Sequence, residues 1–174
     1  MGPCLGVEIG DHMWMSRYLL NRVAESFTLS VSFEPKLYPD WNGSGCHTNF
    51  STKTMREGSW FGKSGMAYIE QMMEKFKAKH KTHMKLYGAG NEKRLTGKHE
   101  TSSADDFSYG AGDRAASFRI PTSTLAAGGK GYIEDRRPAS NIDPYIVGAL
   151  MLSTSCLDGQ GTDELEYHYS KWLQ

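Results

Sequence analysis

The feature that most restricts how this chain can fold is its shortage of the side chains that usually fill a core. Leu, Ile, Val and Phe together account for 30 of its 174 residues. So low a share accompanies disorder when the net charge is high, but here 20 Lys and Arg balance 20 Asp and Glu. Nine Met, nine Tyr and four Trp supply further apolar surface. We therefore expect an ordered domain with a thin core, or part of a larger unit that shares its core with sequence outside this chain.

The balanced charge excludes several classes of partner. A formal net charge of zero provides no general positive field for nucleic acid or an anionic membrane, and no run of about 18 apolar residues predicts a membrane span. The lysine-rich stretch 75–98 is typical of a solvated helix face. Three cysteines are too few for a disulfide framework and fit a reducing compartment. We expect a cytoplasmic protein with no nucleic-acid partner and no membrane partner.

Hydrophobic periodicity predicts three helices. Apolar residues recur at helical spacing over 12–26, over 65–84, and from Pro144 to about residue 152. Asp11 and Asp143 precede the first and third helices as candidate N-caps, and Pro144 suits the first helical position, where a missing N–H costs nothing. The methionines on the second helix are expected to fill core space.

Alternating or short apolar runs predict strands over 28–34, 117–120 and 131–135. The stretch 40–65, rich in Gly, Ser, Asn and Thr, and the stretch 87–116, rich in Gly, Ser and Asp, are expected to be loops. The tail from residue 158 is acidic and is expected to be exposed.

The loop over 41–51 carries residues suited to a small polar ligand. Gly43 and Gly45 allow the backbone to approach a ligand closely. The amide of Asn42 can both donate and accept hydrogen bonds, and His47 can bind a metal or orient a carboxylate. The plainer interpretation of this segment is a glycine-rich turn.

Two further segments collect arginines. Arg94 offers a planar fork for a carboxylate or phosphate, and Glu100 lies in a glycine-flanked loop that suits a gating acid or base. Arg114 and Arg119 lie five residues apart at a loop-to-strand junction and suit a phosphate clamp. Ordinary solvated loops and surface arginines remain the alternative.

The fourth segment, 131–138, alternates its charges. On a strand, Glu134 and Arg136 point to one face while Ile133 and Asp135 point to the other. A carboxylate beside a guanidinium is either a salt bridge or a metal ligand next to an anion binder. Together the four segments supply two candidate metal ligands, four arginines and one loop carboxylate, as phosphoryl transfer from a nucleotide to a carboxylate requires.

The chain closely resembles glutamine synthetase of the eukaryotic type at four segments, 41–51, 94–101, 114–121 and 131–138. They follow one another in the same order as in that family. The flanking segments 10–14 and 141–144 also fit, so the resemblance covers nearly the whole chain. It implies an α+β fold in which residues 1–174 form the C-terminal portion of the catalytic domain, with an antiparallel sheet, a partial barrel, flanked by helices. It also implies ATP-dependent joining of glutamate and ammonia through γ-glutamyl phosphate, and a homo-oligomer in which neighbouring subunits complete each site.

The resemblance assigns roles position by position. It implies metal ligands for Mg²⁺ or Mn²⁺ at His47 and Glu134. Glutamate is implied to bind Asn42, Gly43, His47, Arg94 and Arg136. ATP is implied to bind Asn49, Ser51, Arg114, Arg119 and Tyr132. The implied catalytic residues are Arg114, Arg136 and Glu100, the last on a flap that closes over the intermediate and helps to take a proton from ammonium.

Part of the family pattern is absent. Family members are considerably longer, and they place most of their metal-binding glutamates and a small N-terminal domain before the part that matches. One His and one Glu do not satisfy two hard divalent cations, so we expect the chain alone to make no glutamine. Uncovered strand edges predict poor solubility. A non-catalytic structural or regulatory relative, and a ligase for another amine, are the alternatives. A plastid or mitochondrial form stays open, because a targeting segment would lie in the missing part.

Overall fold

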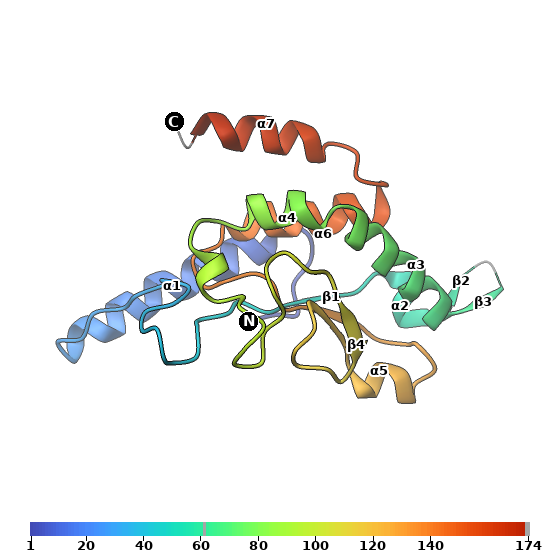
Figure 1. Cartoon of the computed structure of the whole chain (residues 1–174), viewed down its shortest axis with the longest axis horizontal. Coiled ribbons are helices and arrows are strands. Elements are labelled where there is room, and N and C mark those ends of the chain that lie inside the picture. Colours follow the sequence, from blue (N-terminus) through green and yellow to red (C-terminus); the bar gives the residue numbers. More distant parts are fainter. Residues whose placement is uncertain (61, 173–174) are drawn as a thin grey trace.

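The computed structural model describes residues 1–60 and 62–172 (Figure 1). The helices in this part are α1 (Glu8–Ser26), α2 (Lys53–Glu57), α3 (Gly65–Ala78), α4 (His80–Leu86), α5 (Thr122–Ala126), α6 (Pro144–Cys156) and α7 (Thr162–Trp172), with a 3₁₀ turn η1 (Asn91–Lys93). The strands are β1 (Thr48–Phe50), β2 (Ser59–Trp60), β3 (Lys63–Ser64), β4 (Tyr109–Ala111), β5 (Phe118–Ile120) and β6 (Ile133–Asp135).

The central sheet has the order β1-β6-β5-β4, and β2 and β3 form a separate hairpin. β6 runs antiparallel to both β1 and β5, whereas β4 runs parallel to β5. The α+β class is therefore confirmed, but the sheet is mixed instead of antiparallel. Parallel neighbouring strands normally need a long connection. Because β4 and β5 have only three residues each, the short segment 112–117 is long enough to lead from the end of β4 back to the start of β5. β1 and β4 form the edges of the sheet, which stays open in the described part of the chain.

The core lies between this sheet and helices α3, α4 and α6, which cover one face (Figure 1). Its fully buried members come from both layers: Ile69, Met72, Met73, Phe76, Phe118, Ile133, Val147, Leu150 and Met151. The methionines of α3 are core filler, as predicted. α7 packs outside α4 and α6. Within residues 1–60 and 62–172, no helix combines the length and apolar character that crossing a bilayer requires.

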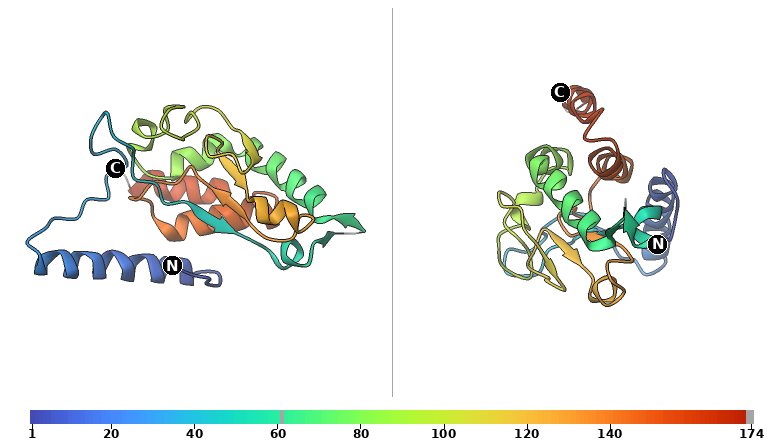
Figure 2. Two further views of the ribbon diagram at one scale, coloured as in Figure 1. Left: turned by 90° about the horizontal axis from the view of Figure 1, so that it is seen from below. Right: turned by 90° about the vertical axis from the view of Figure 1, so that its right-hand side faces the viewer.

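Helix α1 lies along the outside of the molecule and contacts α6 (Figure 2). It begins at Glu8, so Asp11 is not its N-cap; Asp11 lies inside the helix, where its carboxylate accepts a 2.6 Å hydrogen bond from the Tyr145 hydroxyl. The buried residues of α1 are Gly10 and Arg17. Its apolar stripe is half or more exposed: Trp14, Tyr18, Leu19, Val23 and Phe27.

Several other expectations need correction. Residues 28–34 form no strand, and Leu29 is 66% exposed, because no described segment pairs with them. The helix expected over 65–84 is divided at Lys79, where the backbone leaves helical geometry between α3 and α4. The loop over 40–65 contains β1, α2 and the β2–β3 hairpin, and that over 87–116 contains η1 and β4.

The third helix begins as predicted. The Asp143 carboxylate accepts hydrogen bonds from the backbone N–H groups of Tyr145 and Ile146, and Pro144 occupies the first turn. The acidic tail forms α7, and its aspartates are exposed as expected: the side chains of Asp158 and Asp163 are 80% and 90% exposed. Thr162 is fully buried, and Leu165 and Tyr169 pack against the core.

Candidate functional site

Three polar residues form a row across the open face of the sheet, which is the face turned away from α3, α4 and α6. Register pairs Glu134 of β6 with Asn49 of β1 on one side and with Arg119 of β5 on the other. Directly opposed residues of antiparallel strands project to the same face. The alternation of short strands therefore brings together a carboxylate, an amide and a guanidinium from three separate segments.

Glu134 is the centre of this row, although it is only 5% exposed. Its Oε2 lies 2.5 Å from Nε of Arg119 and 3.4 Å from Nη1 of Arg136. Its Oε1 lies 3.3 Å from Nδ1 of His47, which the chain presents just before β1. Burial lowers the pKa of His47, and the Arg136 charge lowers it further against the opposing pull of Glu134. A neutral imidazole thus stands beside a carboxylate, a donor pair that suits a divalent metal ion.

Arg136 connects β6 to the loops around the site. Its Nε donates to the backbone carbonyl of Arg114 at 3.1 Å, and its Nη2 donates to that of Glu100 at 3.3 Å. The Glu100 carboxylate in turn lies 3.6 Å from Nη1 of Arg114. Both of these side chains are more than 60% exposed, so they face solvent at the rim while Arg136 and Glu134 form the floor.

The Glu100 loop, residues 97–103, makes a tight reversal. His99 and Glu100 both have positive φ, 54° and 58°, a region that non-glycine residues enter at a cost in free energy. A β-bridge between Thr96 and Ser103 closes the base of the loop. The loop is therefore held at its base by this bridge and at its tip by the Arg136 bond to the Glu100 carbonyl.

Arg94 lies beneath the 42–47 loop and is 4% exposed. Its Nη2 donates to three successive backbone carbonyls, those of residues 136, 137 and 138, at 2.9, 2.8 and 3.2 Å. A side chain at Gly43 would place its Cβ 2.3 Å from Cγ of Arg94, so glycine is needed for the loop to close over the arginine. Burial, with Arg136 nearby, lowers the pKa of Arg94 to about 10. The guanidinium remains charged at neutral pH and braces the loop against the end of β6.

The remaining predicted site residues surround this floor. Asn42 is exposed on the 42–47 loop. Ser51 and Tyr132 flank the far end of the β1–β6 ladder, where Ser51 Oγ accepts a 2.9 Å hydrogen bond from Arg56. The structure brings His47, Asn49, Glu134, Arg119 and Arg136 together, with Glu100 and Arg114 at the rim, and leaves Ser51 and Tyr132 at one end. Their individual roles stay predictions.

The metal-binding capacity of the site is partial. Among the residues that the structure describes, no group of three or more His, Cys, Asp and Glu side chains is placed to hold a metal ion. His47 and Glu134 provide two donors. Mg²⁺ commonly binds one or two carboxylates and completes its shell with water and substrate phosphate oxygens. The pair therefore fits one part of such a shell.

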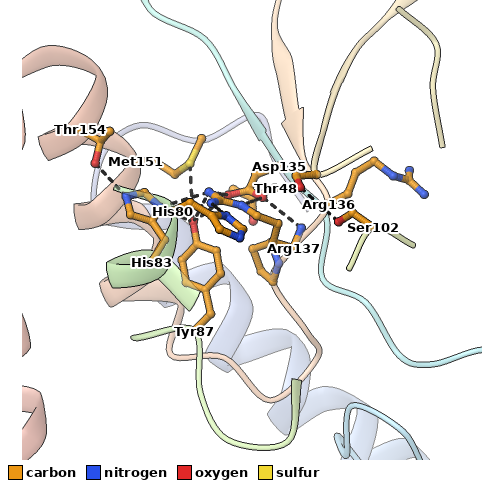
Figure 3. A network of polar contacts seen from close by, with 12 residues as sticks. Thr48, His80, His83, Tyr87, Ser102, Asp135, Arg136, Arg137, Met151 and Thr154 are labelled. Atoms are coloured by element: carbon orange, nitrogen blue, oxygen red, sulfur yellow. Dashed lines mark hydrogen bonds and ion pairs between the residues drawn. The ribbon is translucent and has the colours of Figure 1, made fainter. Parts of the chain in front are cut away.

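Sequence reasoning missed a second polar cluster behind the sheet (Figure 3). We call it the hidden network; its members are His80, His83, Tyr87, Asp135, Arg137 and Thr154. Arg137 and Asp135 are both 0% exposed and form two parallel contacts, from Nε to Oδ1 at 2.9 Å and from Nη2 to Oδ2 at 2.8 Å. Tyr87 donates to Oδ2 of Asp135 at 2.7 Å. Burial alone would raise the pKa of Asp135, but Arg137 and the hydrogen bonds hold it below its ordinary value.

Two histidines of α4 complete the hidden network. Nη1 of Arg137 lies 3.0 Å from Nδ1 of His80, and Nη2 lies 3.2 Å from Nδ1 of His83. Nε2 of His83 contacts Oγ1 of Thr154 on α6 at 2.8 Å. Burial and the Arg137 charge lower the pKa of His83 to about 3. The sequence offers one signal for this cluster: strand alternation places Asp135 and Arg137 on the face opposite to that of Glu134 and Arg136.

Comparisons with known proteins point to one family. The model described as "Glutamine synthetase, catalytic domain" matches residues 3–163. Glutamine synthetase of Saccharomyces cerevisiae is 55% identical over 157 residues, which cover 90% of this chain and 41% of the yeast protein. The Candida glabrata protein of the same name is 57% identical with the same coverage. The chain thus spans about two fifths of the length of these curated relatives.

Solved structures agree in fold. Apo GmaS without ligand superimposes with a TM-score of 0.64 at 28% identity, over 90% of this chain and 35% of that chain. The cryo-electron microscopy structure of Plasmodium falciparum glutamine synthetase gives a TM-score of 0.63 at 21% identity, over 86% of this chain and 30% of that chain.

Proposed function

This chain belongs to the glutamine synthetase family, and on that premise we propose that the protein in which it forms part of the catalytic domain is a glutamate–ammonia ligase that uses ATP. In the proposed reaction the γ-carboxylate of glutamate takes the terminal phosphoryl group of ATP and releases ADP. A base takes a proton from ammonium, and the resulting ammonia displaces inorganic phosphate from the γ-glutamyl phosphate to form the amide of glutamine.

The observation that carries this proposal is the sharing of one buried carboxylate, that of Glu134, by His47, Arg119 and Arg136. Phosphoryl transfer depends mainly on positioning and on neutralising negative charge. The open face places two guanidinium groups and a neutral imidazole around one point of the floor. These groups suit an anionic carboxylate and a polyphosphate better than a neutral substrate.

Each group has a proposed task. When bound, Mg²⁺ or Mn²⁺ supplies charge neutralisation for the phosphoryl oxygens, and His47 and Glu134 would hold it. Arg119 and Arg136 would bind the transferred phosphoryl group, with Arg136 also orienting glutamate. Glu100 would take the proton of ammonium at the rim, where its loop excludes water from the acyl phosphate.

The remaining residues would border the two substrates. Asn42, Gly43 and Arg94 would form the glutamate-binding part of the site. Arg94 would do so through its hydrogen bonds to the backbone carbonyls that follow β6. Asn49, Ser51, Arg114 and Tyr132 would border the nucleotide. Since the chain spans about two fifths of its relatives, the other metal ligands and the partner subunits would come from outside it.

The test uses the full-length protein that contains this chain. We expect glutamine to form only when glutamate, ammonium, ATP and Mg²⁺ or Mn²⁺ are all present, as measured by chromatography of the amino acids. Arg136→Lys should lower kcat about 100-fold, because one charged donor to the transition state is misplaced. Arg22→Lys, on the exposed face of α1, should leave kcat unchanged.

Three outcomes would redirect the proposal. Nucleotide binding with no glutamine formation would favour a non-catalytic structural or regulatory relative. Turnover with another amine in place of ammonium would favour a ligase of different specificity. Robust turnover by the 174-residue chain alone would contradict our expectation that it is inactive for want of metal ligands.

A further inference from the structure

The hidden network reaches the Glu100 loop through one side chain, that of His80. Nε2 of His80 lies 3.0 Å from the backbone carbonyl oxygen of Ala104, directly after the loop base. On the other edge of the ring, Nδ1 lies 3.0 Å from Nη1 of Arg137. His80 is 5% exposed, so both contacts are shielded from water.

The hydrogen-bonding roles of the ring follow from its neighbours. A guanidinium has only donors, so Nδ1 of His80 must accept from Arg137. A carbonyl oxygen has only acceptor sites, so Nε2 must carry the proton and donate to Ala104. The neutral imidazole with its hydrogen on Nε2 satisfies both partners, and no other form does. This ring therefore joins a fixed element to a loop.

The fixed element also holds the floor of the candidate site. Arg137 is bound to Asp135 in β6, next to Glu134 and Arg136. Several bonds fix the loop. At its base these are the Thr96–Ser103 bridge, the Ala104 N–H to Leu95 O bond of 3.0 Å, the 3.2 Å bond from Ser117 Oγ to Ser102 Oγ, and the His80 contact; at its tip, Arg136 donates to the Glu100 carbonyl at 3.3 Å. Of these, the His80 contact is the one that joins the loop base to the hidden network, and so to the Asp135–Arg137 pair.

We propose that His80 is a positioning residue, which locks the base of the Glu100 loop to the Asp135–Arg137 pair and so sets the height of Glu100 above Arg136 and Glu134. The proposal rests on the proposed function for its catalytic consequence but not for the tether itself. The tip, with positive φ at His99 and Glu100, is thus carried on a base that stays in register with β6.

The chain offers a matched set of variants. His80→Asn keeps an acceptor near the Nδ1 position for Arg137 but loses the donor to Ala104. His80→Gln places its amide nitrogen near the Nε2 position and keeps that donor. His83→Asn is the control: His83 also contacts Arg137 through Nδ1, but its Nε2 contacts Thr154 on α6 instead of the loop.

Hydrogen exchange of the full-length protein that contains this chain, followed by mass spectrometry, tests the tether directly. In His80→Asn we expect the amides of residues 96–104 to exchange about fivefold faster, the factor for losing one hydrogen bond. His80→Gln should restore the wild-type rate, and His83→Asn should quicken exchange in α6 but not in the loop. Equal effects of His80→Asn and His83→Asn on the loop, or no effect of His80→Asn, would overturn the proposal.

Two further measurements cover a variant that fails to fold and the link to catalysis. In the wild-type full-length protein, nitrogen-15 NMR of the His80 ring should show the hydrogen on Nε2, protected from exchange; a hydrogen on Nδ1 would overturn the tether. In the full-length protein, His80→Asn should lower kcat/KM for ammonium about fivefold with KM for ATP unchanged, and His80→Gln should recover it. An inactive wild-type protein would refute the proposed function, while the exchange rates would still decide on the tether.

Discussion

Residues 134–137 carry two acid–arginine pairs of identical spacing, Glu134 with Arg136 and Asp135 with Arg137, on opposite faces of β6. Behind the sheet, Asp135 and Arg137 are 0% exposed and bound by two parallel contacts, and Tyr87 and two histidines take part in the remaining hydrogen bonds. On the open face, Glu134 and Arg136 form one contact, of 3.4 Å, and the Glu134 carboxylate also contacts Arg119 and His47.

The difference shows what surroundings do to the same chemistry. A buried charge must have its hydrogen bonds satisfied internally, so the rear pair has its groups committed and serves as structure. The front pair has one carboxylate shared among three basic side chains, which leaves positive groups able to accept an anionic ligand. One strand thus carries its support and its candidate site on alternate residues.

Breaking the rear pair should have the largest effect. Arg137→Met keeps a long side chain but leaves Asp135 buried without its charged partner, so we expect a loss of about 3–5 kcal/mol in the free energy of unfolding. Arg136→Met on the front face should cost about 1–2 kcal/mol, because Arg119 still pairs with Glu134. Urea unfolding followed by circular dichroism measures both. Equal losses would show that the two faces do not differ as described.

Acidification should weaken the rear face next. The pKa of His83 is about 3 in the folded chain against an ordinary value of 6.5, so the unfolded chain binds more protons between these pKa values. The contribution of the neutral His83 ring to the free energy of unfolding is therefore fully present above about pH 6.5 and is lost as the pH falls below that value. From about pH 7 to about pH 5, His83 alone should account for a loss of about 2 kcal/mol.

The same urea experiment at the two pH values checks this, with His83→Asn as the diagnostic variant. The pKa values of His80 and His47 are also lowered by burial and by arginine neighbours, so they add to the loss in the same direction. The Asp135 carboxyl, with its pKa held low, contributes only at still lower pH. A pH dependence that is unchanged in His83→Asn would contradict the buried, neutral state of this ring.

The sequence predicted best what local chemistry decides. The start of α6 follows from Asp143 and Pro144, whose capping roles need only their own neighbours. The common face of Glu134 and Arg136 follows from strand alternation. Both are set within a few residues, and both are found in the structure.

What the sequence could not predict depends on distant partners. Residues 28–34 alternate like a strand, but a strand needs a neighbour, and none is present in residues 1–60 and 62–172. The apolar spacing of α1 predicts the helix but not what covers its stripe, which is half or more exposed in the structure. The hidden network joins α4, β6 and α6, separated by about 50 and 70 residues along the chain, so no local pattern marks His80 or His83 as partners of Arg137.

A milder change on the front face sharpens the comparison. Glu134→Gln keeps the shape but removes the charge that Arg119 and Arg136 share, so we expect a loss of about 1 kcal/mol in stability. In the full-length protein the same change should abolish metal-dependent glutamine formation, because a neutral amide binds a hard cation poorly. Denaturant unfolding and the amino-acid assay separate these effects. Full activity in Glu134→Gln would remove Glu134 from the proposed metal site.

The smallest effect is expected for a third acid–arginine pair, Arg22 with Glu25 on α1. Their atoms lie 2.5 Å apart, closer than the 2.8 Å contact of Arg137 with Asp135, but both side chains are 58% exposed. Water screens such a pair, and ordering two long side chains opposes the attraction, so Arg22→Gln should change the free energy of unfolding by no more than about 0.5 kcal/mol. Urea unfolding at low and high salt measures it. A loss near that of Arg137→Met would mean that distance, and not burial, sets the strength of these pairs, and the contrast between the two faces of β6 would lose its physical basis.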